Sequence, residues 1–242
     1  MNKKKSLAYM YDFYNKHMLH DQNDDIQYYK NQIKHYNSKN VLIVGAGTGR
    51  VAIPLSDIAN VIALDFDEAR LEVLREKSKN LKTICCDIKI FDTKEYFDMI
   101  VFPYSTIQFS NNEIEIDRIL KQLIKIISTD TIILFDISKS FESKQNQKNI
   151  LLFKDYSEEV KDNVSVYYSA KRYDKYIEFN VNYNLEQQKI QLLETEQYYY
   201  HNEKMFNKLL KNNNLKIIKI DYGYGNKNFT HKHIYHVKLD SR

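Results

Sequence analysis

A cluster of glycines is the feature of this sequence best suited to chemistry. Three of the chain's five glycines lie in the run Gly45-Ala-Gly-Thr-Gly49, directly after the apolar segment 41–44. A glycine loop between a strand and a helix lets a ligand approach the backbone closely and meet the N-terminus of the helix. Asp65 ends the next apolar segment, twenty residues after Gly45, where a carboxylate can accept hydrogen bonds from both hydroxyls of a ribose. This spacing predicts a site for a ligand that contains a nucleoside.

The residues after the glycines argue against two common nucleotide sites. A dinucleotide-binding loop needs a further glycine where this chain has Arg50, because helix and strand pack closely there. A phosphate-binding P-loop would place Gly-Lys-Ser/Thr after the loop, and this chain lacks that sequence. NAD is therefore the minority interpretation, and a P-loop nucleotide site is excluded.

A second carboxylate follows the third expected strand. Asp87 comes directly after the segment 83–86, and ligands of open α/β sheets bind in the crevice outside the carboxyl ends of the strands. We therefore expect Asp87 to face the same ligand as Asp65, with a solvated turn aspartate as the alternative. The neighbouring Cys85 and Cys86 form no CxxC spacing and are expected to be buried and inert.

The glycine loop and the two acidic strand ends, in this order, resemble the class I S-adenosylmethionine-dependent methyltransferases over about residues 40–137. The resemblance implies S-adenosylmethionine as cofactor, with the glycines under its methionine moiety, Asp65 on the ribose, Phe66 against the adenine, and Asp87 with the Ile88 amide at the adenine edge. The full set of cofactor contacts that we expect is Tyr11, Tyr14, Gly45, Ala46, Gly47, Asp65, Phe66, Asp87, Ile88, Phe102 and Pro103.

One position departs from the family pattern. Members commonly carry an acidic residue two positions before the first glycine, and this chain has Ile43 there. A contact to the amino-acid end of the cofactor is therefore expected from another residue, for which Phe102, Pro103, Ser105 and Arg50 are candidates. A solvated arginine in the first helical turn is the alternative for Arg50.

The fourth expected strand ends in a sequence that bears on the substrate. Residues 102–105, Phe-Pro-Tyr-Ser, stand where methyltransferases of nucleic-acid bases carry Asp/Asn-Pro-Pro-Tyr. Val101 and Phe102 replace the group that binds the base amine and the first proline. The formal net charge of +4 also gives no strongly basic surface. Nucleic acid is therefore an unlikely partner, and an RNA or protein methyltransferase is the alternative function.

The flanking segments are similar to small-molecule members of the family, including sugar N- and O-methyltransferases and glycine-type methyltransferases. In that branch N-terminal helices close over the cofactor, and a tyrosine there commonly points toward the methyl donor, which makes Tyr11 and Tyr14 candidates. Packing is the alternative for both, because tyrosines at helical spacing commonly form part of a core.

Methyl transfer from a sulfonium is an in-line displacement, so the protein must mainly orient, desolvate and in some cases deprotonate the acceptor. The catalytic residues that we predict are Tyr14, His17 and His201. No metal is expected, and His231, His233 and His236 are expected to lie on a solvated strand face.

The elements that must hold these residues form a doubly wound α/β sheet. Continuous apolar runs predict buried parallel strands, and amphipathic stretches at 67–78 and 112–127 predict the helices between them. Later segments alternate with period two at 164–172, 177–185 and 189–200, which predicts antiparallel strands, whereas 139–148 is polar and loop-like.

We therefore expect one Rossmann-like methyltransferase domain over residues 1–242, with a seven-strand mixed sheet. Its parts are a helical cap at 1–37, a cofactor-binding core at 38–138, a β insertion at 139–200, and a final helix and β hairpin at 201–242.

The composition sets the remaining limits. Of the 242 residues 43% are hydrophobic and 28% charged, which suits a packed core and excludes a disordered or fibrous chain. No stretch approaches ~18 consecutive apolar residues and no signal peptide is recognisable, so we expect a cytoplasmic protein without membrane association, as a monomer or homodimer.

The expected substrate is a small polar metabolite that accepts a methyl group on a hydroxyl or amine, with a nucleotide sugar or surface-polysaccharide precursor as the favoured class. The alternative function that is not enzymatic is a nucleoside-binding regulatory subunit.

Overall fold

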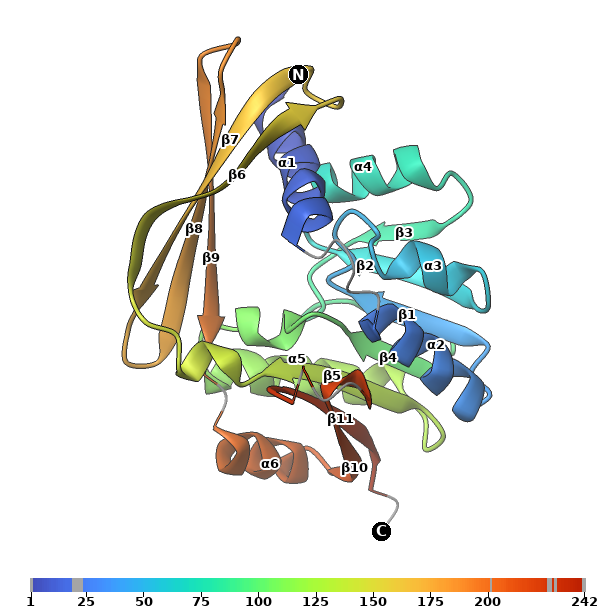
Figure 1. Ribbon diagram of the computed structural model, residues 1–242. Coiled ribbons are helices and arrows are strands. Elements are labelled where there is room, and N and C mark those ends of the chain that lie inside the picture. Colours follow the sequence, from blue (N-terminus) through green and yellow to red (C-terminus); the bar gives the residue numbers. More distant parts are fainter. Residues whose placement is uncertain (1, 19–23, 201, 226–227, 229, 241–242) are drawn as a thin grey trace.

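The computed structural model describes residues 2–18, 24–200, 202–225, 228 and 230–240. A mixed sheet forms its centre (Figure 1). Its strands are β1 (Asn40–Val44), β2 (Asn60–Asp65), β3 (Lys82–Cys85), β4 (Met99–Phe102), β5 (Ile132–Ser138), β10 (Leu215–Tyr222) and β11 (Lys232–Leu239). The order is β10-β11-β5-β4-β1-β2-β3, with β1 to β5 parallel and β11 antiparallel to both of its neighbours. The seven-strand mixed sheet expected from the sequence is confirmed.

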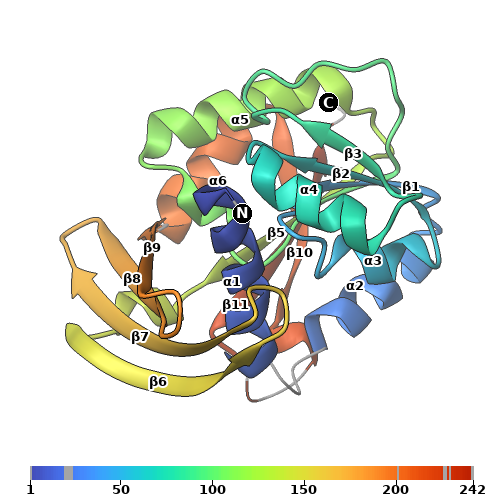
Figure 2. The same ribbon diagram turned by 90° about the horizontal axis from the view of Figure 1, so that it is seen from above.

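The continuous apolar runs reflect burial on both faces of this sheet. In β1, Leu42 and Val44 pack into one hydrophobic cluster, and Val41 and Ile43 pack into another. The first cluster contains α5 (Glu113–Ile126) and α6 (Glu203–Asn212); the second contains α2 (Asp24–His35), α3 (Ala52–Ser56) and α4 (Glu68–Lys77). Figure 2 shows these two groups of helices on opposite sides of the sheet. The arrangement is the doubly wound one that strand–helix alternation predicts.

A second, antiparallel sheet follows β5 in the chain. Its strands pair in the order β6 (Gln147–Ser157), β7 (Asp162–Arg172), β8 (Tyr176–Leu185) and β9 (Ile190–Tyr199). The buried residues of β8 alternate, as the sequence pattern predicts, and their face packs against Met10 and Phe13 of α1 (Lys3–Met18). The inner face of this insertion and α1 thus lie across from the carboxyl edge of the parallel strands (Figure 1).

Two local predictions were wrong, and one helix is shorter than its neighbours. The end of the predicted loop at 139–148 is wrong, because residues 147–148 begin β6. The sequence does not predict this edge strand, since most of it is exposed and lacks period-two alternation. The helix expected after the glycine loop is present as the five-residue α3, which starts late because Gly49 has a φ of +92° and the turn continues to Val51. Cys85 is exposed and Cys86 half-buried because β3 is an edge strand.

The histidine trio is a further correction. β11 lies between β5 and β10, and α2 covers it, so His236 is fully buried instead of solvated. Its ring nitrogens lie 2.7 Å from the Tyr28 hydroxyl and 3.0 Å from the Tyr36 hydroxyl. Burial lowers the pKa of His236 to about 4, so the ring is neutral and anchors α2 to the sheet.

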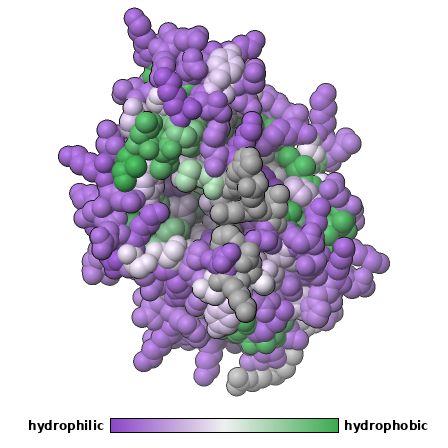
Figure 3. Space-filling model, viewed as in Figure 1, coloured by the Kyte–Doolittle hydropathy of each residue, from purple (hydrophilic) through white to green (hydrophobic). Residues whose placement is uncertain are grey.

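The surface seen in Figure 3 is largely hydrophilic, with apolar side chains in small separate patches. Among the described helices, none is long and apolar enough to cross a membrane.

Candidate functional site

A cleft of about 670 Å³, the main cleft, opens at the carboxyl edge of the parallel strands. Its walls come from residues 44–48, 64–67, 86–89 and 102–104, which are the segments that end β1, β2, β3 and β4. Its volume is in the range of small-molecule sites. All eleven predicted cofactor contacts except Tyr14 line it, so the structure brings the sequence motifs together in one place.

The glycine loop is tightly constrained. Gly45 and Gly47 have φ of +71° and +54°, a region that glycine adopts without steric cost. A Cβ on Gly45 would lie 2.5 Å from Cγ2 of Thr106, whereas one on Gly47 would lie 3.9 Å from the ring of Tyr11. The amides of Gly45 and Ala46 donate to the Leu64 carbonyl, at 2.8 and 3.0 Å, which ties the loop to β2.

Asp65 connects this loop to the end of β2. Its carboxylate is 6% exposed and accepts hydrogen bonds from the Gly47 amide at 2.7 Å and the Asp67 amide at 2.9 Å, one on each oxygen. Burial raises the pKa of Asp65, and these two hydrogen bonds oppose that rise. Each oxygen retains a second lone pair. The group can therefore receive two further donors from a ligand in the main cleft.

Apolar and polar groups flank Asp65 in a way that suits a purine nucleoside. The Phe66 ring lines the main cleft and is 77% exposed, and Ile88 is buried in the facing wall. Asp87 accepts from the Lys89 amide at 2.9 Å, and its other oxygen lies 3.3 Å from Lys89 Nζ. A buried carboxylate with free lone pairs beside an exposed aromatic ring fits a ribose joined to a flat heterocycle.

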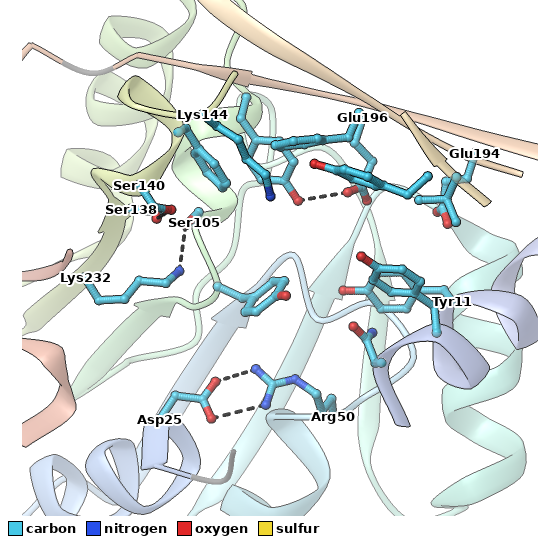
Figure 4. A pocket seen from close by; sticks show the side chains of 18 of the residues that line it. Tyr11, Asp25, Arg50, Ser105, Ser138, Ser140, Lys144, Glu194, Glu196 and Lys232 are labelled. Atoms are coloured by element: carbon cyan, nitrogen blue, oxygen red, sulfur yellow. Dashed lines mark hydrogen bonds and ion pairs between the residues drawn. The ribbon is translucent and has the colours of Figure 1, made fainter. Parts of the chain in front are cut away.

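A second cavity of about 260 Å³, the side cavity, lies between the insertion, α1 and the carboxyl edge (Figure 4). It shares Tyr11, Arg50, Tyr104 and Glu196 with the main cleft, so the two spaces meet at these side chains. The remaining walls come largely from the inner faces of β7, β8 and β9 and from residues 138–144. A ligand in the side cavity would therefore contact a ligand in the main cleft only at this junction.

Arg50 forms one wall of the junction and differs from both expectations. Its guanidinium binds both carboxylate oxygens of Asp25 on α2 and lies 5.2 Å from the centre of the Tyr104 ring. The Asp25 side chain is only 7% exposed. Arg50 is thus largely buried and paired with Asp25, and it anchors α2 to the glycine loop.

Tyr104 and Ser105 form a strained turn at the same junction. Their φ angles are +51° and +63°, which is unfavourable for residues with a Cβ. The Tyr104 amide donates to buried Asp136 at 3.0 Å, and Lys232 Nζ donates to Ser105 Oγ at 3.0 Å. Asp136 at the carboxyl end of β5 therefore holds the turn, a role that sequence reasoning missed.

Sequence reasoning also missed Glu194 and Glu196 of β9. Both carboxylates point into the side cavity (Figure 4), opposite Val181 and Phe179 in the strand register. Acidic residues on the apolar face of a strand are a recognisable signal, because a carboxylate there must find a partner or a ligand. Glu178, half-buried on the other face, carries no such implication.

The three predicted catalytic residues lie in different places. Tyr14 lines the side cavity, and burial raises its pKa to about 12. His17 does not line either space: its nitrogens lie 2.8 Å from the Phe13 carbonyl and 3.0 Å from Asp155, and its ring stacks on Phe153. His17 thus joins α1 to β6. His201 lies outside the described residues.

Comparison with known proteins gives one family and many similar structures. Residues 41–130 match a family model described as a methyltransferase domain. No curated protein matches the sequence.

Three solved structures illustrate the similarity. An S-adenosylmethionine-dependent methyltransferase from Clostridium acetobutylicum has a TM-score of 0.78 at 19% identity, with 95% of this chain and 97% of that chain covered. The sugar N-methyltransferase KedS8 from Streptoalloteichus has a TM-score of 0.77 at 12% identity, covering 96% and 93%. CalS10 from Micromonospora echinaspora, an amino pentose methyltransferase, has a TM-score of 0.73 at 12% identity, covering 95% and 97%. At these identities the structures establish a shared fold that includes the insertion.

Proposed function

We propose that this chain is an S-adenosylmethionine-dependent methyltransferase that methylates an amine or hydroxyl of a small polar metabolite held in the side cavity. The observation that carries the proposal is the junction at which the side cavity meets the main cleft. A donor in one space and an acceptor in the other can touch only there, which is the arrangement that an in-line transfer requires.

The main cleft fits the cofactor. Asp65 would accept hydrogen bonds from the ribose hydroxyls, Phe66 and Ile88 would cover the adenine, and the glycine loop would pass beside the methionine part. S-adenosylmethionine supplies a methyl group on a positively charged sulfur, so no further activation of the donor is needed.

The chain's own residues then have to place and desolvate the acceptor. Tyr11 and Tyr104 narrow the junction, and α1 covers it from the side of the insertion. Tyr14 contributes a hydroxyl that remains protonated at neutral pH, so it can donate a hydrogen bond to an acceptor atom but cannot act as a base there. We retain His201 as the remaining candidate base from the sequence.

The lining of the side cavity favours a hydroxylated, anionic metabolite such as a nucleotide sugar. Asn15 Nδ2 and the Tyr168 hydroxyl are buried there without a hydrogen-bond partner among the described residues, and a polar ligand would satisfy both. Lys144 and Lys232 also line the side cavity and can face a phosphate. KedS8 and CalS10, which share the fold, are described as acting on sugars.

A labelled-methyl transfer screen tests the proposal. Purified protein and methyl-labelled S-adenosylmethionine are incubated with nucleotide sugars, nucleotide amino sugars, small amines, RNA and unfolded protein. Transfer to a sugar nucleotide or another small metabolite is expected. Transfer to RNA or protein alone contradicts the proposed substrate class, and failure of every acceptor with cofactor binding intact favours a regulatory binding protein.

A further inference from the structure

Two glutamates and one arginine form a cluster at the junction. Arg70 reaches from α4, and its Nη2 lies 2.5 Å from Glu194 Oε1 and 3.7 Å from Glu196 Oε1. The Arg70 guanidinium also lies 4.5 Å from the centre of the Tyr11 ring, which places the cluster against α1. Glu194 and Glu196 have side chains only 11% and 21% exposed, so water screens them poorly.

The two glutamates differ in how many of their carboxylate oxygens have a hydrogen-bond or ion-pair partner. Glu194 has one oxygen on Arg70 and accepts a hydrogen bond from the Tyr183 hydroxyl at 3.2 Å on the other. Glu196 accepts from the Tyr198 hydroxyl at 2.9 Å, and its second oxygen is beyond hydrogen-bond distance from Arg70. Glu196 also borders both the main cleft and the side cavity. The unfilled bonding capacity therefore lies on the glutamate at the junction.

The charge of the cluster is unbalanced. One guanidinium faces the two glutamates, and its Nε also lies 3.8 Å from Asp67 Oδ2. The other side chains around the glutamates include the neutral phenols of Tyr11, Tyr14, Tyr104, Tyr183 and Tyr198. Burying an uncompensated carboxylate is costly, so a cationic ligand group would lower the free energy of the site.

A separate observation indicates that a ligand completes this space. The Asn15 amide and the Tyr168 hydroxyl line the same cavity, and these residues are 6% and 7% exposed. Within the part of the chain that the structure describes, neither Asn15 Nδ2 nor the Tyr168 oxygen has a hydrogen-bond partner. Buried polar groups in folded proteins are rarely left unsatisfied, so these atoms point to a polar molecule in the cavity.

We propose that Glu196 binds the methyl acceptor as a protonated amine and receives its proton, with Arg70 and Glu194 as positioning residues. This inference rests on the proposed function and narrows its acceptor from amine or hydroxyl to amine. In the proton step an N–H bond of the ammonium breaks, an O–H bond forms on the Glu196 carboxylate, and the lone pair stays on nitrogen. A neutral hydroxyl would leave the extra carboxylate charge uncompensated.

Glu194 gives the cluster its pH dependence. Burial raises the pKa of Glu194 to about 7, while Arg70 opposes that rise. Above this pH Glu194 is ionised and forms an ion pair with Arg70, which leaves the Glu196 carboxylate available to bind an ammonium group. Below it Glu194 is neutral and Arg70 is released toward Glu196, so the net negative charge of the site falls.

The test uses two sugars that differ in one group, 6-amino-6-deoxy-D-glucose and D-glucose. An alkyl amine of this kind stays protonated from pH 6 to 8. Binding of each sugar to the full chain, saturated with S-adenosylhomocysteine, is followed by NMR of δ-¹³C-labelled glutamate. We expect the amino sugar to bind at least tenfold more tightly at pH 8, with this preference falling several-fold at pH 6. Equal affinities, or no binding of the amino sugar up to 100 mM, would overturn the proposal.

Three variants separate the roles. Glu196→Gln should abolish the preference for the amino sugar. Glu194→Gln should reduce it and remove its dependence on pH, an effect that a purely structural residue would not have. Glu178→Gln removes the same charge from the outer face of the neighbouring strand and should change nothing. Retention of the preference in Glu196→Gln contradicts the assignment.

Affinity for S-adenosylhomocysteine, measured in parallel, separates this inference from the proposed function. If the product binds and a hydroxyl acceptor is methylated, the enzyme assignment stands and the amine subsite is wrong. If the product does not bind the wild-type chain, the proposed function itself fails.

Discussion

Replacing Gly45 by alanine should destabilise the protein and weaken cofactor binding together. The position has a φ of +71°, and the new Cβ would lie 2.5 Å from Thr106 Cγ2 and 2.8 Å from Thr106 Oγ1. Left-handed backbone costs alanine about 1–2 kcal/mol. The overlap with Thr106 adds about 1–3 kcal/mol, the usual range for overpacking. Gly45→Ala should therefore lower the free energy of unfolding by about 2–5 kcal/mol.

Gly225 provides a matched control within the chain. Its φ is +83°, and a Cβ there would meet no atom of the described residues within 4 Å. Gly225→Ala should therefore lose only the backbone contribution of about 1–2 kcal/mol. The difference between the two variants measures the close approach of the glycine loop to Thr106.

Urea unfolding and calorimetric titration with S-adenosylhomocysteine provide the two readouts. Adding Thr106→Ala to Gly45→Ala removes both atoms that overlap most and should recover part of the stability, so the two changes should be non-additive by about 1 kcal/mol or more. Gly45→Ala should also weaken product binding, whereas Gly225→Ala should not. Equal destabilisation by the two alanine variants, with strict additivity in the double variant, would refute the reasoning.

Three other changes test separate parts of the site. Phe66→Ala removes an exposed ring, so the melting temperature should stay within about a degree or two. Calorimetric titration should show a fall of about five- to tenfold in affinity for S-adenosylhomocysteine. Unchanged affinity would contradict the contact between Phe66 and the adenine. Arg50→Met leaves Asp25 as an uncompensated buried charge, so the free energy of unfolding measured in urea should fall by about 3–5 kcal/mol. Adding Asp25→Asn should recover part of this loss. Additive losses from the two substitutions would contradict a stabilising ion pair. Because the pKa of Glu194 is about 7 in the folded protein, the folded chain keeps this proton between pH 4.5 and about 7, whereas the unfolded chain loses it. The free energy of unfolding of the wild type should therefore fall over this range, by up to roughly 3 kcal/mol. Glu194→Gln should lose this component, and parallel stability–pH curves for the two proteins would contradict it.

The sheet could be predicted because the sequence patterns and the packing agree. The glycine loop, the apolar runs and the helix with Ile116, Leu120 and Leu123 on one face each have a single low-energy arrangement in a doubly wound fold. β6 could not be predicted, because an exposed edge strand needs neither apolar residues nor alternation. Its pairing with β7 is a tertiary property.

The main cleft could be predicted and the side cavity could not. Gly45, Asp65 and Asp87 are fixed by backbone conformation and by their places at the ends of strands, which leave a mark in sequence spacing. Glu196 reaches the junction through the curvature and register of the insertion, and Arg70 approaches it from a helix 126 residues earlier. The same physical reason explains His17: its distance from either cavity depends on how α1 docks against β6.

Titration of the wild-type chain and Asp65→Ala with S-adenosylhomocysteine tests the central claim most directly. Asp65 is the buried carboxylate that connects the glycine loop to β2 in the main cleft. The account predicts one molecule bound per wild-type chain and an affinity at least tenfold lower in the folded variant, or about 1.4 kcal/mol or more. Absence of binding by the wild type, or equal affinities for the two proteins, would contradict the assignment of the main cleft as the cofactor site.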